Sequence, residues 1–181
     1  MALIHHPVVD KNGETVAAAG TNLDLHDIAR ASKTYGVEPF YVVTPLEDQQ
    51  RLVVQIIDHW VTGTGARYNP DRQAALALIR LSPSLQAVLA DMTERFGVRP
   101  QTVVTSAQMA ASDLEWDGLR HLANGERPIL LLFGTAWGLA PEVIQQADYR
   151  LAPIAGRGDY NHLSVRSAVS IVLDRMAGFN R

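Results

Sequence analysis

A run of apolar residues that ends at a glycine is the feature that most constrains the fold of this chain. Residues 129–133 are continuously apolar and are followed at once by Gly134. A strand buried on both faces of a parallel sheet has this pattern, whereas a half-exposed strand alternates apolar and polar residues. Gly134 and Gly138 bracket a loop at the carboxyl end of this strand, where open α/β sheets bind their ligands. The run therefore predicts an α/β fold with a ligand-binding edge.

Strand and helix patterns alternate along the rest of the chain, which favours one α/β domain over residues 1–181 with a mainly parallel sheet flanked by helices. We expect strands at residues 3–9, 40–44, 101–105, 129–133 and 150–153, and a short return strand at 15–19 after a turn at 10–13. We expect helices at residues 24–35, 46–61, 84–96, 113–123, 141–147 and 162–176, with a loop at 62–70. Residues 71–81 fit either a helix or a helix that leads into a short strand. The expected N-caps are Asn22 or Asp24 for the first helix and Ser82 or Ser84 for the helix at 84–96.

Composition and charge limit the classes of function. The net charge is -3 with a pI near 6.0, which argues against a protein that coats nucleic acid through many phosphate contacts. A local basic patch remains compatible, and all of the 16 basic residues except Lys11 and Lys33 are arginine, the better bidentate phosphate partner. With no cysteine, disulfides and thiolate metal sites are excluded. No run is long enough to cross a membrane and the first residues do not resemble a secretory signal, so we expect a cytoplasmic protein.

Two glycine-containing loops are the candidate binding segments. The loop from Gly134 to Gly138 lacks the Gly-Lys-Ser/Thr of a nucleoside triphosphate site and the three-glycine dinucleotide fingerprint. It fits either close approach of a purine-bearing cofactor or a tight turn with Trp137 in the core. The second loop, at residues 156–162, is polar, and its Asp159 or Asn161 fits either a binding role or the N-cap of the last helix.

Three motifs in order resemble the SPOUT class of S-adenosylmethionine-dependent RNA methyltransferases. The first two are LLLFGTAWGL at residues 130–139 and YNHLSVRSAVSIVLD at residues 160–174. The third is N-terminal: Asn22, then a helix that carries Arg30, then Tyr35-Gly36-Val37. The resemblance implies a C-terminal trefoil knot around S-adenosylmethionine, a tRNA or rRNA substrate, a homodimer with the apolar face of the last helix as its contact surface, and no metal.

The same resemblance implies the residues of the site. Arg30 and Asn161 would be catalytic, with Asp24 as a further polar candidate beside the acceptor. The residues implied to bind the cofactor are Thr105, Ser106, Phe133, Gly134, Thr135, Trp137, Gly138, Leu139, Leu151, Ile154, Tyr160, Asn161, His162, Leu163 and Ser164. Thr105 and Ser106 end a predicted strand, and their alternative role is to cap the following helix.

Two positions depart from the pattern of the ribose 2′-O branch of this class. Asp24 stands two residues after Asn22, where that branch usually has glycine. The last helix begins Leu163-Ser164-Val165-Arg166 in place of Leu-Asn-Val-Ser, which makes Arg166 a candidate to engage phosphate or the methionine carboxylate. These departures leave the acceptor open between a base nitrogen and a ribose oxygen.

Other residues and other functions stay open at this point. His5, His6, Asp24 and His26 include possible general bases, but their spacing matches no zinc site. The segment 67–72 joins two arginines to an aromatic residue, which suits RNA contact or an exposed solvated loop. The competing functions are a non-catalytic cofactor- or RNA-binding module and an α/β enzyme that acts on a small nucleotide or metabolite.

Overall fold

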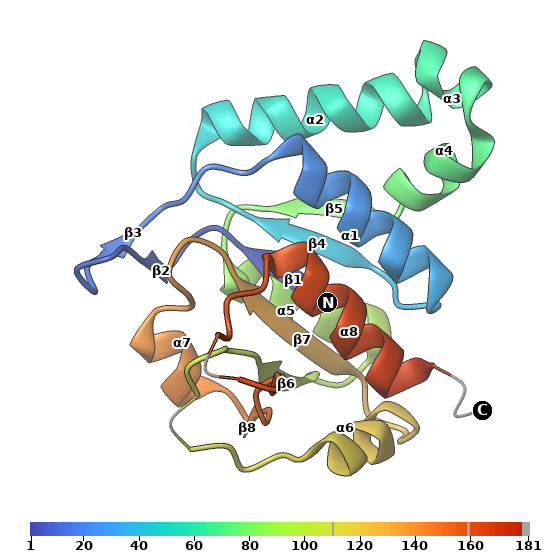
Figure 1. Cartoon of the computed structure of the whole chain (residues 1–181). Helices are drawn as coiled ribbons and strands as arrows, with labels where there is room; N and C mark the ends of the chain where they lie inside the picture. The colour runs from blue at the N-terminus through green and yellow to red at the C-terminus, as the bar shows by residue number, and fades with distance from the viewer. Residues whose placement is uncertain (110, 159, 179–181) are drawn as a thin grey trace.

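The computed structural model describes residues 1–109, 111–158 and 160–178, and its centre is a six-stranded parallel sheet (Figure 1). The strand order is β5-β4-β1-β7-β6-β8, and every pairing in this sheet is parallel. The expected α/β fold with a mainly parallel sheet is therefore confirmed. The six strands are β1 (Ala2–Ile4), β4 (Phe40–Val43), β5 (Ile79–Ser82), β6 (Gln101–Val104), β7 (Ile129–Gly134) and β8 (Tyr149–Arg150).

A small hairpin of β2 (Val8–Val9) and β3 (Thr15–Val16) pairs antiparallel beside this sheet. The expected strand at 3–9 is thus two strands, β1 and β2, which belong to different sheets. The expected strand at 150–153 is also shorter, since β8 ends at Arg150 and Leu151 forms only an isolated bridge with Leu114.

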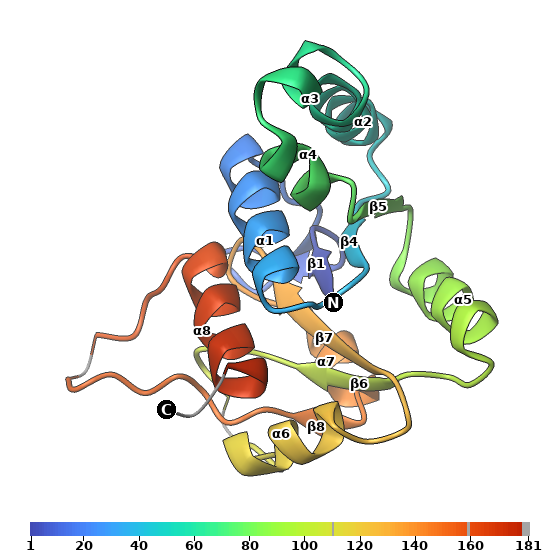
Figure 2. The same ribbon diagram turned by 90° about the vertical axis from the view of Figure 1, so that its right-hand side faces the viewer.

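The sheet is covered on both faces, as its continuously apolar strands require. Alternate residues of β7 enter two different hydrophobic clusters: Leu131 and Phe133 in one, Leu130 and Leu132 in the other. Helices α1, α4, α6 and α8 cover the first face, while α5, α7 and the hairpin cover the second (Figures 1 and 2). The helices are α1 (Asn22–Thr34), α2 (Glu47–Val61), α3 (Thr64–Tyr68), α4 (Pro70–Leu76), α5 (Leu85–Phe96), α6 (Trp116–Ala123), α7 (Pro141–Gln146) and α8 (Val165–Ala177).

Several helix ends differ from the sequence-based expectation. Thr21, and neither Asn22 nor Asp24, caps α1, because its side chain accepts a hydrogen bond from the Asp24 N–H. Ser84 caps α5 as one of the two expected residues. The expected loop at 62–70 contains the short helix α3, and residues 71–81 are a helix that leads into β5.

The apolar face of α8 lies inside the protein. Val169, Val172, Leu173 and Met176 are all buried, and α8 packs against α1, α6 and β7. The expectation that this apolar face forms a dimer surface was therefore wrong, because the chain's own core already covers it. Among the described residues, no helix has both the length and the apolar character needed to cross a membrane.

Candidate functional site

Three loops follow three neighbouring strands at one edge of the sheet. Their described residues are 105–109 and 111–113 after β6, 135–140 after β7, and 151–158 and 160–164 after β8. Because β7, β6 and β8 are adjacent and parallel, their carboxyl ends lie at the same edge. Asn161 also links two of the loops, since its Nδ2 donates to the Ala107 carbonyl at 3.4 Å. The structure thus brings together the segments that were expected to bind the cofactor.

The loop after β7 is a tight turn built against β1 and β2. A Cβ atom at Gly134 would lie 2.6 Å from the Leu139 nitrogen, so only glycine fits the observed backbone. Gly138 has a φ of +119°, a conformation that side chains rarely adopt. The Thr135 N–H donates to the Ile4 carbonyl at 3.2 Å, and the Trp137 N–H donates to the Val9 carbonyl at 3.1 Å. The missing side chain of Gly134 therefore makes room for the loop's own backbone. This is the tight turn that the sequence allowed as the alternative to close approach of a cofactor.

Trp137 does not fill the core, although the tight-turn alternative placed it there. Its side chain is 66% exposed, and Tyr160 and Leu163 in the loop after β8 are 81% and 44% exposed. Such apolar side chains at a ligand-binding edge can cover the faces of a purine and its ribose. The loop before α8 also extends away from the body of the molecule (Figure 2). These groups fit S-adenosylmethionine, whose adenosine needs apolar faces to pack against.

Several expected cofactor residues have structural partners. Phe133, Leu139 and Leu151 are buried, and Ile154 packs on the edge of the core. The Thr105 hydroxyl donates to the Leu132 carbonyl at 3.0 Å, which ties the end of β6 to β7. Ser106 accepts from the Gln108 N–H at 3.1 Å in a turn. Neither residue caps a helix, since α6 starts only at Trp116.

The cap of α8 is Ser164. Its hydroxyl accepts from the Ser167 N–H at 3.3 Å, so the capping role considered for Asn161 belongs to Ser164. Asp159, the other cap considered, lies outside the described residues. His162 makes an edge-to-face contact with Tyr160, with ring centroids 6.3 Å apart. Asn161 and His162 are thus placed in the loop after β8 and remain candidate ligand contacts.

The two departures from the family pattern, Asp24 and Arg166, contact each other. Arg166 Nη1 lies 3.1 Å from Asp24 Oδ1, and Arg166 Nε lies 3.4 Å from Asp27 Oδ2. Asp24 is only 7% exposed, and its second oxygen accepts from the Thr21 hydroxyl at 2.6 Å. Arg166 is therefore held by two carboxylates of α1, a partnership that no local sequence signal indicates.

His5 lies between this ion pair and the loop after β7. It is 1% exposed, and its Nδ1 is 3.3 Å from the Thr135 hydroxyl. Its Nε2 is buried and has no hydrogen-bond partner within the part of the chain that the structure describes. Burial lowers the pKa of His5, and nearby Asp24 partly offsets that effect. Of the histidines considered as bases, His5 is thus a neutral group beside the candidate site.

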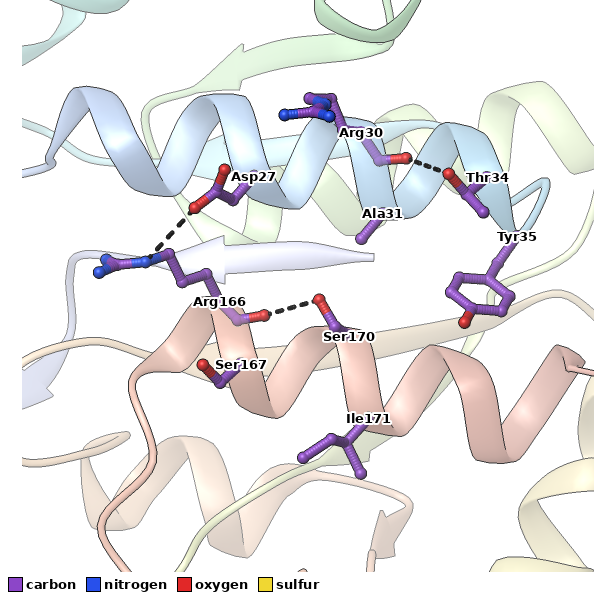
Figure 3. A pocket seen from close by; sticks show the side chains of 9 residues that line it. All are labelled: Asp27, Arg30, Ala31, Thr34, Tyr35, Arg166, Ser167, Ser170 and Ile171. Atoms are coloured by element: carbon purple, nitrogen blue, oxygen red, sulfur yellow. Dashed lines mark hydrogen bonds and ion pairs between the residues drawn. The ribbon is translucent and has the colours of Figure 1, made fainter.

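Arg30 lies elsewhere, in a groove between α1 and α8 (Figure 3). The groove has a volume of about 610 Å³. It is lined by Asp27, Arg30, Ala31, Thr34, Tyr35, Arg166, Ser167, Ser170 and Ile171. Figure 3 shows Asp27 and Arg166 paired at one end, with Arg30 further along α1. The catalytic role expected for Arg30 stays a prediction.

Comparison with known proteins gives the chain a family context. A family model described as "SAM-dependent RNA methyltransferase" matches residues 1–178. A protein of Oleidesulfovibrio alaskensis named tRNA (guanine-N(1)-)-methyltransferase is 46% identical over 98% of this chain, but the match spans only 41% of that relative. An Aquifex aeolicus protein named only as uncharacterized is 38% identical over all of this chain and 89% of its own length.

Among solved structures, the chain is similar to the SpoU methyltransferase AviRb from Streptomyces viridochromogenes in complex with the cofactor AdoMet. The TM-score is 0.54 and the identity 17%, over 98% of this chain and 56% of the other. At this identity the likeness concerns the fold alone. The named tRNA methyltransferase is more than twice as long as this chain, which matches only about two fifths of it.

Proposed function

Since this chain belongs to the SAM-dependent RNA methyltransferase family, we propose that it transfers a methyl group from S-adenosylmethionine to RNA. The expected resemblance to the SPOUT class is confirmed by this family match together with the shared fold. One observation carries the proposal: the loops after β6, β7 and β8 leave the same edge of the sheet, and the loops after β7 and β8 expose Trp137, Tyr160 and Leu163. The trefoil knot expected for the class is part of the proposal.

The chain's own residues would bind and orient the two reactants. When bound, S-adenosylmethionine supplies an electrophilic methyl group on a sulfonium. Trp137, Tyr160 and Leu163 would pack on the adenosine and exclude water, which places the methyl donor in a fixed position. Asn161, anchored on Ala107, would contact the acceptor from the loop after β8. Arg30 would hold an acceptor phosphate through its guanidinium.

The acceptor is a base nitrogen or a ribose oxygen of tRNA or rRNA. Guanine N1 is the acceptor named for the O. alaskensis relative, whose name describes a protein much longer than this match. The paired Asp24 and Arg166 replace residues of the ribose 2′-O pattern, and this observation favours the base nitrogen over the ribose oxygen. Methylation of total bacterial RNA with labelled cofactor, followed by nucleoside digestion and mass spectrometry, identifies the modified nucleoside.

The cofactor site is tested by calorimetric titration of S-adenosylmethionine into wild type and Trp137→Ala. We expect the variant to bind about fivefold more weakly, because an exposed aromatic face packed on a ligand contributes roughly 1 kcal/mol. Phe96→Ala is the matched control, since Phe96 is a 49% exposed aromatic at the end of α5. Equal binding by all three proteins would remove Trp137 from the site. Absence of binding by the wild type would contradict the proposed function.

We further propose that the protein is a homodimer and acts in the cytoplasm, where its RNA substrates are. The apolar face of α8 is used within the chain, so the contact would be made by the opposite side of α8 and by α1. That side carries small groups, among them Ala31, Ser167 and Ser170, which allow two helix pairs to approach closely.

A further inference from the structure

A second pocket lies between α1 and α4 and is rich in positive charge. Its volume is about 360 Å³. It is lined by Arg30, Lys33, Thr34, Asn69, Asp71, Arg72, Ala74 and Ala75. We propose that this pocket binds backbone phosphate of the RNA substrate; the inference rests on the proposed function and adds to it a binding site outside the cofactor loops.

The guanidinium of Arg72 is held in place before any ligand arrives. Its carbon lies 4.5 Å from the ring centroid of Trp60, which is a cation–π contact. Trp60 is itself fixed by edge contacts with His26 and His59, at centroid distances of 5.4 and 5.1 Å. The Arg72 Nε is buried and has no hydrogen-bond partner among the residues that the structure describes. A preorganised guanidinium loses little conformational freedom when it binds an anion.

The positive charge of the pocket is not neutralised by the protein. Over residues 1–109, 111–158 and 160–178, no carboxylate lies within 4.0 Å of the side-chain nitrogens of Arg30, Lys33 or Arg72. Among the described residues that line the pocket, Asp71 is the one acidic side chain, against three cations. Arg166 in the neighbouring groove differs, because Asp24 and Asp27 pair with it.

The excess positive charge of the pocket also acts on the neighbouring His26. Burial lowers the pKa of His26, and Arg72 and Arg30 lower it further, while Asp27 works in the opposite direction. His26 therefore stays neutral beside the pocket near neutral pH, so the positive charge there comes from Arg30, Lys33 and Arg72. The pocket is consequently an open site with a local positive potential on a protein whose net charge is -3.

The pocket lies beside the groove that extends toward the start of α8. Arg30 and Thr34 line both cavities, so the two meet along α1. The groove reaches Arg166 and Ser167 at the start of α8, directly after the loop that carries Tyr160 and Leu163. Because the proposed dimer covers the groove, an RNA strand with its acceptor at the carboxyl edge would place a flanking phosphate on Arg72 and Lys33 from outside the groove.

Helix α3 adds a surface for a base next to the phosphate site. Tyr68 ends α3, is 88% exposed and directly precedes Asn69 of the pocket. Arg67 beside it is also exposed. Aromatic rings next to guanidinium groups are the usual means of holding an unstacked RNA base. This combination favours RNA over a small anion such as free phosphate.

The test compares the affinity for bulk bacterial tRNA of wild type and the double variant Lys33→Gln/Arg72→Gln across a salt series. We expect the double variant to bind about tenfold more weakly at 0.1 M salt, and the slope of log affinity against log salt to fall by about two. Affinity for S-adenosylmethionine should be unchanged. The matched control is Arg51→Gln/Arg99→Gln, which also removes two positive charges, both on exposed side chains, but touches neither cavity. Lys33→Gln alone, on an exposed side chain, serves as a variant that folding cannot compromise.

The outcomes separate the pocket from the activity. Selective loss of tRNA affinity in the pocket variant supports the inference. Equal tRNA affinity and salt slope in wild type, pocket variant and control would overturn it, while methyl transfer by the wild type would leave the proposed function standing. A wild type that methylates no RNA but loses tRNA affinity in the pocket variant would overturn only the function. The pocket would also be overturned by a third result. In that result the wild type does not bind tRNA, and the pocket variant and the control variant bind inorganic phosphate equally well.

Discussion

Asp24 and Arg166 stand 142 residues apart in the chain and form an ion pair at 3.1 Å. Each departs from the ribose 2′-O pattern, and each departure on its own would leave a charge beside the cofactor loops. Together they neutralise one another, with Asp27 as a second partner for Arg166. The pair also fastens the start of α8 to the start of α1, so it positions the loop that ends at Ser164.

A double-mutant cycle with Asp24→Asn and Arg166→Gln should give a coupling energy of about 1 kcal/mol in urea unfolding. The reason is that Asp24 is nearly buried, and Arg166 is about one-third exposed, so water screens their attraction only in part. Glu47 and Arg51 on α2 form a matched exposed pair, for which we expect roughly 0.3 kcal/mol. Equal coupling in both cycles would show that the Asp24–Arg166 pair is no stronger than an ordinary surface contact.

At the scale of an element, the turn after β7 is set by the backbone and not by its exposed side chains. Gly134→Ala should lower the free energy of unfolding by about 2 kcal/mol or more, because the new Cβ would collide with the Leu139 backbone. Gly158→Ala is the control, since its Cβ would meet nothing within 4 Å, and we expect a change below about 0.5 kcal/mol. Urea unfolding at constant m-value measures both. A Gly134→Ala protein as stable as wild type would contradict the steric argument.

The helices and strands could largely be predicted from the sequence, because their periodicity is a local signal. Helix α5 begins after its expected cap Ser84, and β7 follows the run at 129–133 and includes Gly134. Helix α3 was missed because five residues are too few to show a helical period. The Asp24–Arg166 pair and the burial of His5 could not be predicted from the sequence. Both depend on which segments, distant in the chain, become neighbours in the fold.

At the scale of the whole molecule, the two sides of α8 have different roles. The buried side stabilises the folded protomer, and the opposite side makes the proposed dimer contact. Leu173→Ala should cost about 3 kcal/mol of protomer stability, since Leu173 is fully buried. Ile171 lines the groove on the other side, so Ile171→Ala should change protomer stability by less than about 1 kcal/mol and weaken the proposed dimer about tenfold. Chemical unfolding and sedimentation equilibrium measure the two effects. Dissociation by Leu173→Ala without loss of protomer stability would reverse this assignment.

The strand order has a consequence for synthesis of the chain. β1 lies in the middle of the sheet, between β4 and β7, yet about 125 residues separate it from β7. At roughly 5–20 residues per second, the ribosome needs on the order of ten seconds between these two strands. β4 emerges earlier and can pair with one side of β1, and β5 can then pair with β4, while the other side of β1 waits with open backbone groups. For that interval the nascent chain carries an unpaired strand edge, which makes early contact with other chains its main hazard.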